Sequence, residues 1–112
     1  RLSKRINVHP YPNKVTFTDN EAEFNRLTLR DCNLIHESRR YEGCCCWSEC
    51  KGAIVVCVLN GSQSTLCHEL NHVAIRIFYH VGMPVNEDTE EAFCYLVESM
   101  HKQCAAFMLR NS

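Results

Sequence analysis

The sequence predicts an α+β domain in which a small, mostly antiparallel sheet packs against two helices. Three observations lead to this fold class. Residues 53–59 form a β-branched run that ends at Asn60-Gly61, which is typical of a strand. Residues 66–81 and 89–109 carry apolar side chains at helical spacing. A chain of 112 residues is long enough for one modest core, so we expect a single domain over residues 1–112.

The N-terminal part shows weaker signals. Residues 1–13 are basic and contain two prolines, so we expect them to form an irregular N-terminal arm. Residues 14–17 are expected to form a strand. Residues 18–21 match a capping box and predict a short helix over residues 22–29.

Nine cysteines are the unusual feature of the composition. An odd number cannot all pair within one chain, so we expect reduced thiols in a cytoplasmic protein rather than a disulfide scaffold. Cys57, Cys67, Cys94 and Cys104 are expected to be small buried hydrophobic residues.

The other cysteines lie in the weakest region, residues 30–50. A hairpin is expected to begin near residues 45–47 and to lead into the strand at 53–59. The alternative for Cys44, Cys45, Cys46 and Cys50 is a second metal site, with His36 nearby. Their spacing matches no standard C-x-x-C pair.

Charge and hydropathy exclude some classes of partner. The formal net charge is −1, which does not suggest a nucleic-acid partner. No apolar run approaches the roughly 20 residues that a membrane helix needs, and no signal peptide is evident. We therefore expect a cytoplasmic protein with no membrane or nucleic-acid partner. The oligomeric state is left open.

One stretch of the helix at 66–81 carries recognisable chemistry. His68-Glu69-x-x-His72 is the HExxH pattern of zinc hydrolases. Residues four apart lie on one helix face, so both imidazoles can reach one ion. Glu69 is placed to take a proton from a water on that ion. The pattern predicts Zn²⁺ as the cofactor, His68 and His72 as ligands, and Glu69 as the general base.

The sequence also marks the ends of this helix. Ser62, Ser64 and Thr65 are candidate N-caps. Gly82 suits the left-handed position after the last turn, and Pro84 follows as a stop. These signals predict a helix of about four turns, a common length in globular proteins.

The second helix, residues 89–109, begins with acidic residues that favour the positive end of its dipole. Most of that acidic start is expected to be simply solvated. The apolar stripe of this helix is expected to face the core and consists of Phe93, Leu96, Val97, Met100, Cys104 and Phe107.

Residues 65–98 resemble the small zincin-like proteins encoded by phages and prophages, which are of the gluzincin type. The resemblance rests on HExxH and on Glu91-Ala92-Phe93-Cys94-Tyr95, which is close to the second motif Asn-Glu-Ala-Phe-Ala-Tyr. It implies a minimal zincin-like fold with Glu91 as the third zinc ligand. Cys94 would be the small residue that lets the two helices approach. Glu91 is preferred to Glu90 because Glu90 leads into the apolar stripe.

The chain departs from the gluzincin pattern at two points. Some gluzincins have an aspartate where this chain has Tyr95, whose hydroxyl is a possible accessory group but whose default role is packing. No residue stands out as the stabiliser of an oxyanion. Tyr79, His80 and His101 are the candidates for that role.

These features predict a zinc metallopeptidase that hydrolyses a peptide or protein substrate held along the strand at 53–59. Two alternatives stay open. One is a phage-encoded, zinc-stabilised binding or inhibitor protein without turnover, located in the host cytoplasm. The other is a metal-dependent amidase or cell-wall hydrolase, which the lack of an export signal disfavours.

Overall fold

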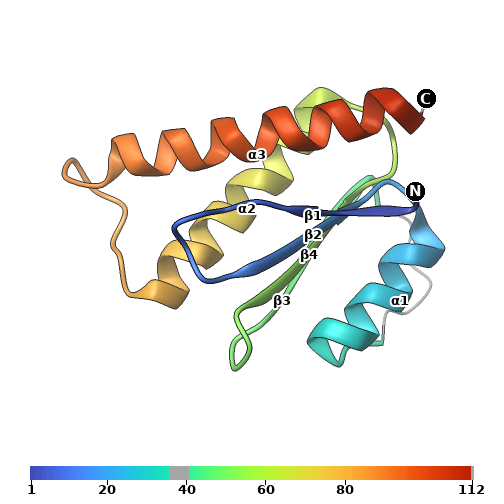
Figure 1. The fold of residues 1–112 in the computed structure, drawn as a ribbon, viewed down its shortest axis with the longest axis horizontal. Helices are drawn as coiled ribbons and strands as arrows, with labels where there is room; N and C mark the ends of the chain where they lie inside the picture. Colours follow the sequence, from blue (N-terminus) through green and yellow to red (C-terminus); the bar gives the residue numbers. More distant parts are fainter. Residues whose placement is uncertain (36–40, 112) are drawn as a thin grey trace.

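The computed structural model describes residues 1–35 and 41–111, which form a sheet with helices on both faces (Figure 1). Helix α1 packs on one face of the sheet, and α2 and α3 pack on the other. The α+β class is as predicted. The elements are β1 (Ser3–Ile6), β2 (Lys14–Thr18), α1 (Glu21–Cys32), β3 (Gly43–Ser48), β4 (Ala53–Val58), α2 (Gln63–Val81) and α3 (Glu90–Asn111).

The strand order of the sheet is β1-β2-β4-β3. The two outer pairs of strands, β1 with β2 and β3 with β4, are antiparallel. The β3–β4 pair is the hairpin that was predicted to lead into the strand at 53–59. The central pair, β2 with β4, is parallel and places Val15 opposite Ile54. Since β4 is paired on both sides, its backbone cannot take up another strand. The expectation that a peptide lies along residues 53–59 is therefore wrong.

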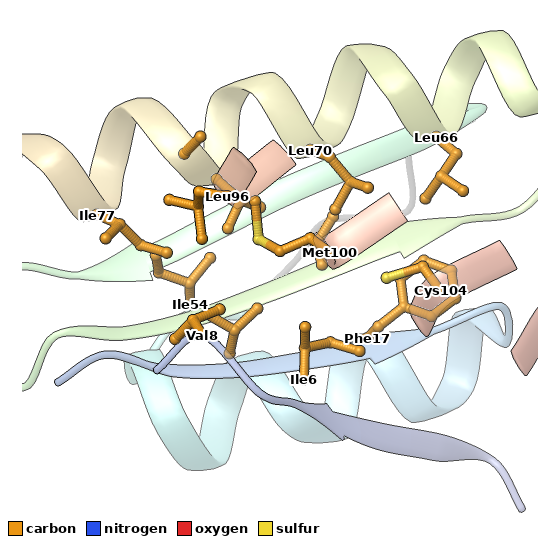
Figure 2. Close-up of a cluster of buried hydrophobic side chains, with 14 of the residues drawn as sticks. Ile6, Val8, Phe17, Ile54, Leu66, Leu70, Ile77, Leu96, Met100 and Cys104 are labelled. Carbon is orange, nitrogen blue, oxygen red and sulfur yellow. The ribbon is translucent and has the colours of Figure 1, made fainter. Parts of the chain in front are cut away.

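The central strand β4 is buried on both faces, which explains its continuous apolar sequence. Ile54, Val56 and Val58 face α2 and α3, whereas Val55 and Cys57 face α1. Figure 2 shows the larger of the two cores, where side chains of α2 and α3 meet those of β1, β2 and β4. This core fixes α2, and hence the HExxH motif, against the sheet.

The ends of α2 follow the sequence signals. The side chain of Ser62 caps the helix by accepting a hydrogen bond from the amide of Thr65. Gly82 adopts a left-handed conformation with φ of 75° at the other end. No helix in the described part of the chain is both long and apolar enough to cross a bilayer.

Two expectations for the N-terminal part are wrong. The segment expected to be an irregular arm contains β1, which is anchored by buried Ile6 and pairs with β2 along its whole length. Thr18 does not cap α1, because it belongs to β2 and its hydroxyl donates to the carbonyl of Leu2. Asn20 is the cap instead, and its Oδ1 accepts from the amide of Glu23 at 2.8 Å.

The structure describes all nine cysteines, and none of them forms a disulfide. Cys57 and Cys104 are buried as expected, but Cys67 and Cys94 are exposed. The reason is that α3 packs through the apolar stripe next to Cys94, which leaves both thiols at a groove between α2 and α3.

The cysteine run lies on β3, where the Sγ atoms of Cys44 and Cys46 are 4.0 Å apart. Cys50 is exposed at the turn after β3. His36, the proposed partner of these thiols, lies outside the described residues.

Candidate metal centre and the strand beside it

The two histidines of the HExxH motif converge on the surface of α2. The Nε2 atoms of His68 and His72 are 3.2 Å apart, and their ring centroids are 4.9 Å apart. Both side chains are exposed. The i, i+4 spacing brings the rings together because neighbouring helical turns stack these positions.

This separation fits two ligands of one metal ion. Two imidazole nitrogens bound to zinc at about 2.0–2.1 Å with a tetrahedral angle lie about 3.3–3.4 Å apart. The observed 3.2 Å between His68 and His72 is close to that value. The pair therefore matches two corners of a zinc site in both donor chemistry and spacing.

Glu69 lies next to this pair but is buried, with 7% of its surface exposed. It packs against Gly43, the first residue of β3: a Cβ built on Gly43 would lie 2.9 Å from Cγ of Glu69. Burial raises the pKa of the Glu69 carboxyl, and His68 and His72 partly oppose the rise. A carboxylate with a raised pKa is a stronger base than an exposed glutamate.

A surface pocket of about 410 Å³ opens where α2 meets β3. It is lined by Glu42, Gly43, Ser64, Thr65, His68 and Glu69. The pocket therefore adjoins His68, one member of the histidine pair, and the first residue of β3, which is an edge strand of the described sheet.

The third predicted ligand is not assembled with the first two. Glu91 is exposed in the first turn of α3. Among residues 1–35 and 41–111, no three His, Cys, Asp or Glu side chains form a ready metal-binding group. The role of Glu91 therefore stays a prediction. Glu42, which shares the pocket with His68 and Glu69, is a carboxylate that the sequence did not single out.

The predicted accessory residues lie in other places. Tyr79 and His80 line a separate pocket near the C-terminal end of α2. Tyr95 is exposed and lines a groove beside the segment that follows β1. His101 borders the groove between α2 and α3. None of these four lines the pocket that His68 and Glu69 share.

Gly43 is a second residue that the sequence did not assign to this site. Gly43 begins β3 and lets that strand approach Glu69. A glycine in a strand often marks a close approach of two backbones, and that signal was present in the sequence.

Comparisons with protein families, with curated proteins and with solved structures find no match to this chain.

Proposed function

We propose that this chain is a cytoplasmic, zinc-dependent peptidase in which Glu69 is the general base. The observation that carries the proposal is the arrangement on α2. Two imidazole nitrogens lie 3.2 Å apart, and a buried carboxylate lies between them in sequence, facing an edge strand. If this face of α2 only contacted solvent, nothing would require Glu69 to be buried while His68 and His72 stay exposed.

His68 and His72 would hold the metal, with Glu91 as the third ligand on the strength of the resemblance. When bound, zinc supplies a Lewis acid that lowers the pKa of a water towards about 7. No group of three ligands is preformed in the described residues, so the proposal includes completion of the site on metal binding.

Glu69 would perform the proton transfers. As water oxygen attacks the peptide carbonyl carbon, the Glu69 carboxylate accepts the water proton. The protonated carboxyl then donates that proton to the leaving nitrogen as the C–N bond breaks, which restores the carboxylate. Burial raises the pKa of the Glu69 carboxyl in the metal-free chain, which favours acceptance of the water proton.

The substrate backbone would lie along the outer edge of β3. This strand pairs only with β4 within the described sheet, so one row of its amides and carbonyls is available to an extended peptide. Gly43 brings the start of that edge to Glu69. We therefore place the scissile bond near Gly43.

Metal analysis combined with a peptide-library digest tests the proposal. The purified chain should carry about one zinc per molecule. The Glu69→Gln variant should keep its zinc and stability yet lose activity by about 10²–10⁴-fold. Glu87→Gln, a change at an exposed glutamate before α3, is the matched control and should leave the rate unchanged. A folded chain that takes up no metal, or a fully active Glu69→Gln variant, would refute the proposal.

A second candidate, a zinc-stabilised binding or inhibitor protein, is favoured by one observation. Glu91 is exposed at the start of α3 and belongs to no three-ligand cluster among residues 1–35 and 41–111. For such a protein, Glu69→Gln would leave the biological effect intact, whereas His68→Ala would lower the stability of the zinc-loaded chain.

A further inference from the structure

A second pocket, of about 210 Å³, lies at the other end of the seam between β3 and α2. Its walls include Trp47 of β3 and Arg76, Tyr79 and His80 of α2. Asn13 and Ile54 also line it and are almost fully buried, with 8% and 2% of their surfaces exposed.

Asn13 has a hydrogen-bonding group that its protein neighbours leave unused. Its Nδ2 donates to the carbonyl oxygen of Gly52 at 3.0 Å, which fixes the orientation of the amide. Its Oδ1 is buried and accepts no hydrogen bond from the described residues. A buried acceptor without a donor is costly, so this end of the pocket favours a ligand with an O–H or N–H group.

The other walls narrow the ligand class. The Arg76 guanidinium lies 4.3 Å from the ring centroid of Trp47 and 5.6 Å from that of Tyr79. Glu49 also lines the pocket and offsets this positive charge, so the walls favour neither a cationic nor an anionic ligand. The bare Oδ1 of Asn13 disfavours a carboxylate, because two acceptors would face each other. A neutral ring that packs on Ile54 and on the aromatic walls meets both conditions.

We infer that this pocket binds a neutral aromatic ring that carries a hydrogen-bond donor, as in the side chains of tyrosine and tryptophan. The ring packs against Trp47 and Ile54. Because Oδ1 of Asn13 is itself buried in the free protein, the side chains of the pocket wall shift on binding to let the donor reach it. This binding does not depend on metal or catalysis.

The position of the pocket suggests its use, and this use rests on the proposed peptidase function. Arg76 lies seven residues after Glu69 on α2, which is about 10 Å along the helix axis. Trp47 lies four residues after Gly43 on β3, which is about 13 Å along the strand. A peptide along β3 with its scissile bond near Gly43 would place a side chain three or four residues away at this pocket.

The test uses the single tryptophan of the chain, Trp47, whose indole N–H gives one assignable NMR signal. Wild-type protein is titrated with p-cresol and 3-methylindole, which are the side-chain analogues of tyrosine and tryptophan, and with toluene, which lacks the donor. Saturable shifts of the Trp47 signal are expected for the first two. Toluene should bind about fivefold more weakly, since one hydrogen bond contributes about 1 kcal/mol. Equal affinity for toluene and p-cresol, or no saturable shift with p-cresol, would overturn the inference.

Variants identify the responsible groups. Asn13→Ala should remove the preference for p-cresol over toluene. Should that variant fail to fold, Tyr79→Ala gives an independent answer, because this side chain is 75% exposed and contributes little to the core. Tyr79→Ala should weaken p-cresol binding, whereas Tyr95→Ala, a change at another exposed helical tyrosine, should not. Equal effects of the two tyrosine changes would place the binding elsewhere.

One further variant separates this inference from the proposed function. Glu69→Gln should bind p-cresol as tightly as the wild type, because Glu69 does not line this pocket. A chain that binds p-cresol but cleaves no peptide would refute the peptidase and support the pocket. A chain that cleaves peptides but whose Trp47 signal does not shift with p-cresol would support the peptidase and refute the pocket.

Discussion

Gly43 provides the sharpest test of how β3 and α2 fit together. In Gly43→Ala, the added Cβ would lie 2.8 Å from Cγ2 of Thr65, 2.9 Å from Cγ of Glu69 and 3.1 Å from the carbonyl oxygen of Cys57. The first two contacts are closer than ordinary packing allows, and the third involves backbone held in β4. The strand, the helix or Glu69 itself must therefore move.

The size of the effect follows from two opposing terms. Adding a methyl group to a packed site typically destabilises a protein by about 1–3 kcal/mol. Replacing glycine by alanine also restricts the unfolded chain, which returns about 0.4–1 kcal/mol. We therefore expect a net loss of about 1–2 kcal/mol in the free energy of unfolding. At this chain length such a loss lowers Tm by roughly 4–8 °C.

A double-mutant cycle assigns the loss to the contact itself. Thr65→Ser removes Cγ2 but keeps the hydroxyl that accepts from Nδ2 of Asn60 at 3.0 Å. In the Thr65→Ser background, Gly43→Ala should cost at least about 0.5 kcal/mol less than in the wild type. Urea denaturation of the four proteins measures this difference. An unchanged stability of Gly43→Ala, or an equal penalty in both backgrounds, would show that β3 does not approach α2 as described.

Three other predictions concern the metal, an ion pair and the thiols. Elemental analysis should show that His68→Ala and His72→Ala abolish zinc binding, whereas His101→Ala does not. Glu91→Ala should lower zinc affinity more than Glu90→Ala does. The reverse order would show that the register assumed for α3 is wrong. Nε of Arg30 lies 2.7 Å and Nζ of Lys14 lies 3.3 Å from Oδ1 of Asp31, and both charges hold the pKa of this carboxyl below its usual 3.8. The stability that the two ion pairs add is therefore present above that pH and is lost as the pH falls through the folded-state pKa. Acid titrations of stability should show this loss, of about 1 kcal/mol at most, in the wild type and not in Asp31→Asn. A thiol reagent should modify exposed Cys50, Cys67 and Cys94 well before Cys104, whose pKa burial raises to about 12, and mass spectrometry of the labelled peptides measures the order.

Local patterns in the sequence predicted the elements that depend on local interactions. Helix α2 has apolar residues at helical spacing, a serine cap and a glycine stop, and each signal lies within the element. The HExxH pair was predictable for the same reason, since the i, i+4 geometry brings His68 and His72 together in any helix. The strand at 53–59 was predictable because a central strand is apolar on both faces.

The missed features depend on contacts between distant segments. Four residues of β1 show too little alternation to indicate a strand, and their pairing with β2 supplies the evidence. Helical spacing separates the faces of α3 but does not show which neighbour covers each face, and so Cys94 was wrongly expected to be buried. Asn13 joins its pocket only because its amide reaches Gly52, 39 residues away.

The two edges of the sheet differ in how they resist aggregation. The outer strand β1 carries Lys4 and Arg5, and charge on an edge strand discourages pairing with other molecules. The opposite edge, β3, has the sequence GCCCWS and carries no charged side chain. No other strand of the described sheet pairs with this edge, and its thiols, exposed tryptophan and lack of charge favour edge-to-edge pairing between copies. At high concentration the protein is therefore expected to self-associate through β3, and a peptide that occupies this edge would keep the copies apart.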